Sequence, residues 1–249
     1  MGDSYIMFKR NLKKTMRSPE AMIMALVVPF VMMVLFGLIF GSVAEIEGFS
    51  YINFIVPGII LQCICNASGA TALSVHGDMS KGIVDRFRSM RISKAAFISG
   101  HVGVSVIRNI IIVAVSFGAA ILIGFRPEGG FFDWLVIAGI LFLFIVAITW
   151  IVVIIGLIVK DTEGVSGVTF LLTLFTFISS GFAPVENLPT ALRIFAQYQP
   201  MTAIVDAMRG LLMGSPVQSE IALAVVWCVG IIIVAFILAL RIYKNKMTV

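Results

Sequence analysis

Long uncharged stretches constrain this chain more than any other feature of its sequence. Six of them lie between ionised side chains, at 21–44, 48–77, 109–125, 134–159, 164–185 and 221–240. A helix that crosses a bilayer needs about 20 mainly apolar residues, and most of these stretches reach that length. With 60% hydrophobic and 12% charged residues, the 249-residue chain also carries more apolar side chains than a water-soluble fold of this size buries. The sequence therefore predicts an all-α polytopic membrane protein.

The stretches predict six transmembrane spans, which form one domain over residues 1–249. The spans are expected at 21–44, 51–75, 99–125, 134–159, 164–183 and 221–241. They lack the alternation of apolar and polar residues found in barrel strands, so they are helical. The third stretch is the shortest, and we expect its helix to begin near Ala95. Arg108 would then lie at the depth of the lipid headgroups, where its long side chain can reach water.

Basic residues are distributed unevenly over the two sides of the predicted spans. The side that carries both termini holds 14 of the 18 lysines and arginines and a net charge of +8, whereas the other side has a net charge of −4. Short loops rich in lysine and arginine stay in the cytoplasm, so both termini are predicted to be cytoplasmic. The formal net charge of +5 reflects this topology and contact with anionic lipid, and it does not indicate a nucleic-acid-binding surface.

The N-terminal segment 1–18 combines apolar and basic side chains. Tyr5, Phe8, Leu12 and Met16 recur at helical spacing, and five lysines and arginines cover most of the remaining surface. This pattern predicts a helix that lies along the membrane interface. A solvated basic head that only fixes the topology fits the same residues.

The cytoplasmic loop between the second and third spans contains a short amphipathic segment at 82–91. Ile83, Phe87 and Met90 lie at positions i, i+4 and i+7 and form an apolar stripe, whereas Asp85 and Arg86 lie on the opposite face. A helix of this length cannot cross the bilayer. It is suited to a groove on another protein, and it fits equally well a helix lying flat on lipid.

An interrupted external segment follows the fifth span. Gly181, Pro184 and Pro189 break the helix, and Asn187 is expected to cap a new one with Pro189 in its opening turn. Pro200 separates this piece from a second helix that ends near residue 213. The pieces, at 187–213, are too short to span, so they form either a structural lid or a gate on a transport path. The candidate gate residues are Pro184, Glu186, Asn187, Pro189 and Pro200.

The sequence contains no catalytic motif. It has no G-x-x-x-x-G-K-[ST] loop for nucleotide binding, and its three cysteines lack the spacing of a metal site. Ser180 is predicted near the external ends of the spans and both histidines on the cytoplasmic side, so no serine is paired with a base. The near absence of ionisable residues in mid-membrane argues against an ion-coupled carrier. We therefore expect a protein that is not an enzyme and that takes its energy from elsewhere.

Three parts of the chain carry a family resemblance. They are the loop 81–89, the pair Arg108-Asn109 that enters the third span, and the external segment 179–189 with its continuation through 199–202 to 206–210. Together they resemble the membrane subunits of type-2 ABC exporters, specifically the daunorubicin-resistance-like drug-efflux permeases. The resemblance covers essentially the whole chain. One departure is Arg91, which stands where such permeases commonly have a proline after the loop helix.

The resemblance implies a half-transporter with no cofactor of its own. Two copies of the six-helix unit, or one copy paired with another permease, would dock on two separate ATPase subunits that bind ATP and magnesium. Docking would use the amphipathic loop helix, with the coupling residues Gly82, Ile83, Val84, Asp85, Arg86, Phe87, Arg88 and Met90. The implied location is a bacterial or archaeal plasma membrane.

The implied cargo is a small hydrophobic drug, antibiotic or natural product, so the implied phenotype is drug resistance by efflux. Relatives of such permeases export lipid-linked glycans or other lipids, and the sequence does not select among these substrates. A membrane assembly or sensor subunit that transports nothing is a hypothesis of a different class. Substrate-dependent efflux would separate the two classes.

Overall fold

The computed structural model describes residues 2–16, 19–40, 45–46, 49–80, 94–215 and 217–246. Within them the chain is helical apart from turns and two short strands, which confirms the all-α prediction. The helices are α1 (Gly2–Met16), α2 (Pro19–Phe40), α3 (Tyr51–Ser80), α5 (Lys94–Ile123), α6 (Phe131–Ile158), α7 (Thr162–Phe177), the 3-10 helix η1 (Val185–Asn187), α8 (Thr190–Tyr198), α9 (Pro200–Leu212) and α10 (Gln218–Lys246). The strands β1 (Glu45–Ile46) and β2 (Phe49–Ser50) pair antiparallel, with Glu45 opposite Ser50.

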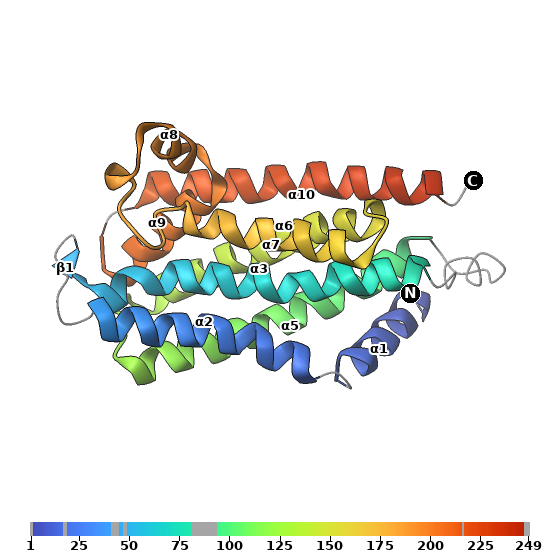
Figure 1. The fold of residues 1–249 in the computed structure, drawn as a ribbon, viewed down its shortest axis with the longest axis horizontal. Coiled ribbons are helices and arrows are strands. Elements are labelled where there is room, and N and C mark those ends of the chain that lie inside the picture. The colour runs from blue at the N-terminus through green and yellow to red at the C-terminus, as the bar shows by residue number, and fades with distance from the viewer. Residues whose placement is uncertain are drawn as a thin grey trace.

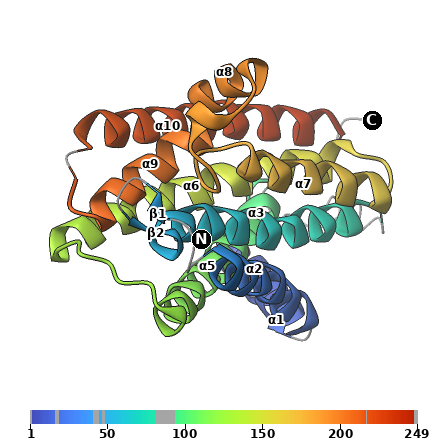
Figure 2. The ribbon, with the colours of Figure 1, turned by 60° about the vertical axis from the view of Figure 1, so that its left-hand side comes forward.

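Six helices, α2, α3, α5, α6, α7 and α10, run roughly along one axis of the molecule (Figure 1). At one end lie α1 and the last turns of α10, and we call this the termini end. At the opposite end lie β1, β2, α8 and α9, and we call this the β end (Figures 1 and 2). Both ends of the chain are therefore on the same side of the bundle. That this side faces the cytoplasm stays a prediction.

Among the described residues, four helices are long and apolar enough to cross a membrane. They are α3, α6, α10 and the Phe97–Ile123 part of α5. α2 has 22 residues and α7 has 16. The prediction of a membrane protein with several spanning helices is therefore confirmed, whereas the count of six spans stays a prediction.

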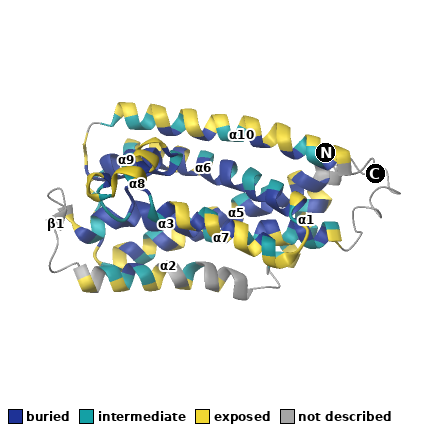
Figure 3. Cartoon of the chain, turned by 45° about the horizontal axis from the view of Figure 1, so that its top comes forward, coloured by how far each residue is buried: buried dark blue, intermediate teal, exposed yellow. Residues whose placement is uncertain are grey.

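α3 is the central helix, since it packs against α2, α5, α6 and α7. Its side chains are buried along nearly the whole helix, including Phe54, Ile59 and Ile64. A helix that is apolar on every face belongs in an interior. α10 is the opposite case, because it packs on α6 and α9 and exposes Val226 and Ile233 on its outer face (Figure 3). An exposed apolar face of this kind is suited to contact with lipid.

The fifth apolar stretch is helical over a shorter range than the sequence predicts. α7 begins at Thr162, because the Asp161 carboxylate caps it by accepting a hydrogen bond from Gly164 N at 2.6 Å. It ends at Phe177, whereas the predicted span reaches residue 183. A turn at 178–184 takes its place, because the Ser179 hydroxyl bonds to backbone groups on either side of it.

The prediction that the Arg108 side chain reaches water is wrong, whereas its depth in the membrane stays a prediction. Arg108 is 8% exposed, and its Nη2 donates to Ala67 O at 2.7 Å and to Thr71 Oγ1 at 2.6 Å, both on α3. The physical reason is that α3 packs on α5 at this level and supplies two oxygens that accept from the guanidinium. The guanidinium therefore lies inside the bundle and is held by α3.

α1 packs through only part of the apolar stripe that the sequence predicts. Tyr5 at the start of the stripe is 65% exposed, whereas Phe8 contacts α5 at Gly103 and the neighbouring Met7 and Asn11 are buried. Met7 lies against Gly100 of α5, where a Cβ atom would come within 2.8 Å of Met7 Cβ. Small residues let helices approach this closely. α1 is therefore docked on the bundle and does not lie on the membrane interface alone.

Candidate functional site

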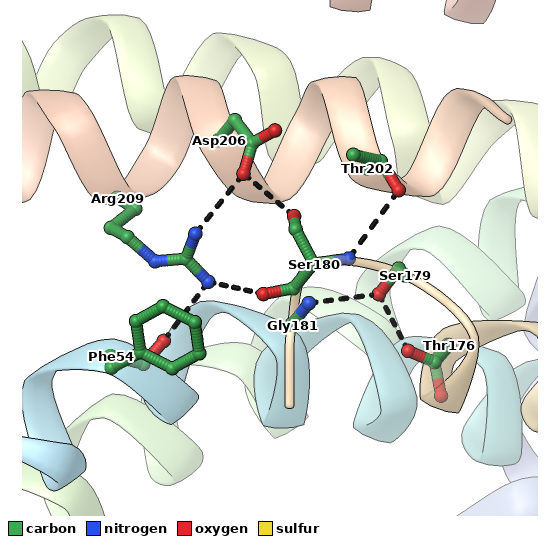
Figure 4. Close-up of polar contacts among 8 residues, drawn as sticks. All are labelled: Phe54, Thr176, Ser179, Ser180, Gly181, Thr202, Asp206 and Arg209. Atoms are coloured by element: carbon green, nitrogen blue, oxygen red, sulfur yellow. Dashed lines mark hydrogen bonds and ion pairs between the residues drawn. The ribbon is translucent and has the colours of Figure 1, made fainter. Parts of the chain in front are cut away.

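The turn at 178–184 is tied to α9 at the β end. Ser180 N donates to Thr202 Oγ1 at 3.4 Å, and Ser180 Oγ donates to Asp206 Oδ1 at 2.6 Å (Figure 4). Next to Ser180, Gly181 N donates to Ser179 Oγ at 3.1 Å. These short polar side chains satisfy backbone groups that no helix pairs, as irregular backbone inside a membrane protein requires.

The same turn touches the central helix through two glycines. A Cβ atom on Gly58 of α3 would lie 2.6 Å from Gly181 O and 2.7 Å from Gly181 Cα. In the reverse direction, a Cβ atom on Gly181 would lie 2.7 Å from Gly58 Cα. Real Cβ atoms do not approach backbone this closely, so only glycine fits at both positions. The contact fixes the turn against α3.

Arg209 joins three segments at one point. It lies on α9 and its Nη2 donates to Phe54 O of α3 at 3.3 Å and to Ser180 O of the turn. Its guanidinium carbon is 3.8 Å from the centroid of the Phe54 ring (Figure 4). An arginine is suited to this position, because its planar head donates several hydrogen bonds and stacks on aromatic rings. We call Ser180, Asp206 and Arg209 the Arg209 anchor.

Asp206 balances the charge of Arg209. Arg209 Nη1 lies 3.1 Å from Asp206 Oδ1, one helical turn earlier on α9. The Arg209 side chain is 9% exposed and the Asp206 side chain 36% exposed. A buried cation is costly unless it is paired and hydrogen-bonded, and here a carboxylate and two carbonyl oxygens meet that requirement. The anchor is therefore a stable polar contact within an apolar bundle.

A polar pocket of about 320 Å³ opens beside the anchor. Its walls come from the turn, η1, α9 and the start of α10, and they include Pro184, Glu186, Asp206, Arg209 and Glu220. Three carboxylates and one guanidinium therefore line a cavity at the β end of the bundle. The pocket and the turn that borders it form the candidate functional site.

The candidate gate residues all lie in this region, but they do not form a single cluster. Pro184 precedes η1, which contains Glu186 and Asn187, and only Pro184 and Glu186 line the polar pocket. Asn187 does not cap α8, because Pro189 occupies the cap position and Asn187 lies in η1. Pro200 is the first residue of α9, as the break at that position predicted. Asn187 and Pro189 are exposed.

The predicted coupling residues, Gly82, Ile83, Val84, Asp85, Arg86, Phe87, Arg88 and Met90, lie outside the residues that the structure describes. The pair Arg108-Asn109 is described, lies on α5 and bonds to α3. Asn109 Nδ2 donates to Ser68 Oγ of α3 at 3.2 Å, and Ser105 and Thr149 hydroxyls bond at 3.0 Å between α5 and α6. This pair therefore holds helices together in the middle of the bundle.

Sequence reasoning missed the Arg209 anchor. It used Asp206 and Arg209 as external charges and as part of the segment that carries the family resemblance, but it did not pair them. One signal was present, since an aspartate and an arginine at i and i+3 inside an apolar stretch are placed to pair on a helix. The partners on α3 and in the turn carried no such signal, because they are backbone carbonyls.

A second, apolar pocket of about 490 Å³ lies between α6, α7, α8, α9 and α10. Its walls include Phe144, Phe175, Phe195, Trp227 and Gln199. Drug-sized ligands occupy pockets of roughly 300–1,000 Å³ with mainly apolar and aromatic walls. By size and lining, the pocket suits a hydrophobic molecule.

Residues 3–213 match the family model described as ABC-2 type transporter. The chain is also similar to named permeases over most of its length. It is 27% identical over 230 residues to the daunorubicin resistance ABC transporter permease protein DrrB1 of Streptomyces coeruleorubidus, which covers 92% of this chain and 81% of that protein.

Two further relatives have the same extent of similarity. The chain is 26% identical over 235 residues to the "Probable doxorubicin resistance ABC transporter permease protein DrrC" of Mycobacterium tuberculosis, covering 94% of this chain and 85% of that protein. It is 25% identical over 240 residues to the inner membrane transport permease YadH of Escherichia coli, covering 92% of each chain.

Proposed function

Because the chain belongs to the ABC-2 type transporter family, we propose that it is the membrane-spanning permease of an ATP-driven exporter of hydrophobic drugs, antibiotics or natural products. The observation that carries the proposal is the similarity, over 92% of this chain, to a permease named for daunorubicin resistance. The apolar pocket of about 490 Å³ supports it, because it has the size and lining that a drug-sized hydrophobic molecule needs.

In this proposal the energy comes from a partner. The sequence has no nucleotide-binding loop, so two copies of a separate ABC ATPase subunit bind ATP and magnesium, and the permease itself is not an enzyme. The permease works as a pair, with a second copy or a related permease, in the plasma membrane. The termini end faces the cytoplasm, because that side holds most of the basic residues.

The two regions singled out in the sequence have separate roles in this proposal. The loop residues 82–91 dock on the ATPase subunit. At the β end, the turn and η1, with Pro184, Glu186, Asn187, Pro189 and Pro200, form an external gate that opens when the ATPase subunits bind ATP. The location of the polar pocket supports the gate, since it lies where η1, α9 and α10 meet and a movement of η1 would change its width.

Replacing Phe87 with aspartate should uncouple the two subunits. Phe87 is the central residue of the apolar stripe, and a charge there would have to be desolvated in the groove of the ATPase subunit. We expect drug efflux from cells that express both subunits to fall to background. The permease should still insert in the membrane at the wild-type level.

The matched control is Ser89→Asp, which adds the same charge to the polar face of the same predicted helix. It should leave both efflux and binding of the ATPase subunit close to wild type. Full efflux with Phe87→Asp would mean that segment 82–91 lies on lipid and does not dock on the ATPase subunit.

Efflux also separates the proposed function from its alternatives. Cells that lack other drug pumps are loaded with daunorubicin, and its loss is followed by fluorescence with and without the permease and its ATPase subunit. Efflux that requires both subunits supports a drug exporter. An exporter of lipid-linked glycans, or a sensor subunit that transports nothing, gives no drug efflux from a complex that is assembled and hydrolyses ATP.

A further inference from the structure

A cluster of charged side chains at the termini end lies far from the candidate site. The carboxylate of Asp78 on α3 is 3.2 Å from Arg10 Nη2 and 3.2 Å from Lys14 Nζ, both on α1. It is also 3.3 Å from His101 Nε2 on α5. Lys14 Nζ donates in addition to Ser74 Oγ of α3 at 3.1 Å. One carboxylate therefore connects three helices that are distant in the sequence.

The centre of this cluster is buried and its periphery is open. The side chains of Asp78 and His101 are each 2% exposed, whereas those of Arg10 and Lys14 are 33% and 51% exposed. A carboxylate removed from water is stable only when opposite charges and hydrogen-bond donors surround it. If the Asp78 carboxylate were neutralised, the two basic residues of α1 would lose the anion that holds them. Asp78 is therefore the central group of the contact between α1 and the bundle.

Packing around the cluster fixes the same three helices. Met7 of α1 contacts Gly100 of α5, and Phe8 of α1 comes within 3.1 Å of the position that a Cβ atom on Gly103 would occupy. α1 packs on α5 more extensively than on any other element. The apolar contacts therefore join α1 to α5, and Asp78 adds a direct contact between α1 and α3.

The cluster also has a specific place along the chain. Asp78 lies two residues before the end of α3 at Ser80, and α5 begins at Lys94. The proposed ATPase-docking segment 82–91 connects these two helix ends. The helices that flank this segment pack on each other, and Asp78 links both of them to α1.

We propose that Asp78 is a positioning residue for coupling, which holds α1 and the ends of α3 and α5 together as one unit. A displacement of segment 82–91 by the ATPase subunit is then passed to α1 and to both flanking helices at once. Without the carboxylate, the segment moves while α1 does not follow. The direction of the movement, from the ATPase subunit to α1, rests on the proposed function. The contact itself is independent of what the protein transports.

The experiment measures amide hydrogen exchange in α1 of the complex of permease and ATPase subunit. Exchange is compared without nucleotide and with ATP plus vanadate, which after hydrolysis traps ADP and vanadate on the ATPase subunits. In the wild type, we expect trapping to change the exchange of α1. In Asp78→Asn, α1 should exchange about tenfold faster without nucleotide, because its contact opens more often, and trapping should have no further effect.

Three variants make the test specific. Asp78→Glu keeps the carboxylate and should restore the response of α1 to trapping. Gly100→Val leaves every charged group in place but forces α1 away from α5, so it should resemble Asp78→Asn. Gly118→Val is the matched control for Gly100→Val on the same helix, because nothing lies within 4 Å of the position that a Cβ atom at residue 118 would occupy.

A functional readout accompanies the exchange data. The amount of daunorubicin moved per ATP hydrolysed should fall about fivefold in Asp78→Asn while ATP hydrolysis continues, because the subunits stay docked and transmission is lost.

A response of α1 to trapping that is the same in Asp78→Asn and the wild type would overturn the proposal. An unchanged ratio of transport to hydrolysis would overturn the coupling role and leave a purely structural contact. If the wild type hydrolyses ATP but moves no drug, the proposed function fails, and the exchange response still decides whether Asp78 transmits the movement.

Discussion

Replacing Gly58 with alanine should destabilise the protein strongly, whereas the same substitution at Gly77 on the same helix should not. A Cβ atom at residue 58 would lie 2.6 Å from Gly181 O, so α3 and the turn would have to separate. Nothing lies within 4 Å of the corresponding position at Gly77. We expect a loss of at least about 3 kcal/mol for Gly58→Ala, at the upper end of the overpacking range because backbone cannot move aside as a side chain can.

The measurement is the midpoint temperature of unfolding in detergent, followed by size-exclusion chromatography of heated samples. Gly181→Ala should lower it by a similar amount, because its Cβ atom would meet Gly58 Cα at 2.7 Å. Gly77→Ala should stay within about 1 kcal/mol of the wild type, the usual effect of glycine to alanine inside a helix. Equal midpoints for Gly58→Ala and Gly77→Ala would show that the turn does not pack on α3 in this way.

Replacing Arg209 with leucine should have the second large effect. The guanidinium bonds to Phe54 O, to Ser180 O and to the carboxylate of Asp206, and leucine offers none of these donors. Hydrogen bonds to charged groups contribute about 1.5–3 kcal/mol each, and the loss of several at a site this buried should cost about 3 kcal/mol or more. Thermal unfolding in detergent measures this loss.

Two further variants serve as comparisons for Arg209→Leu. Asp206→Asn keeps an oxygen that accepts from Ser180 and Arg209 but removes the charge that balances the buried guanidinium, so it should destabilise the protein less than Arg209→Leu does. Arg193→Leu on α8 lies outside the anchor and should be neutral. A wild-type midpoint for Arg209→Leu would contradict the anchor.

The anchor also separates the gate from a static lid. Arg209→Lys keeps the positive charge but cannot reproduce the planar arrangement of donors, so it should weaken the contact and leave the protein folded. A change in the rate of efflux at unchanged ATP hydrolysis would support a gate that moves. An unchanged rate would support a lid.

The general architecture could be predicted because bilayer thickness fixes the length of apolar helices. The long uncharged stretches became α3, α5, α6 and α10, and the glutamine and proline at 199–200 marked the junction between α8 and α9. The end of α7 could not be read in the same way. Residues 178–183 are uncharged and largely apolar, and the turn there depends on the hydroxyl of Ser179, which hydropathy does not detect.

The polar contacts could not be predicted from the sequence for a different reason. Periodicity shows which residues share a face of a helix, but not which distant segment that face meets. Arg209 and Phe54 are 155 positions apart, and Asp78 and Lys14 are 64 apart. The Arg108 side chain was expected to reach water because a buried charge is costly, and α3 lowers that cost by supplying Ala67 O and Thr71 Oγ1.

The central claim is that this chain forms the path by which an ATPase subunit drives a hydrophobic drug across the membrane. The most direct test reconstitutes the permease with its ATPase subunit in liposomes and follows daunorubicin fluorescence in the lumen after ATP is added outside. Vesicles whose ATPase subunits face outward should accumulate the drug, and they should do so only with both subunits and with ATP that can be hydrolysed. A complex that hydrolyses ATP but accumulates no more drug than vesicles without the permease would contradict the account.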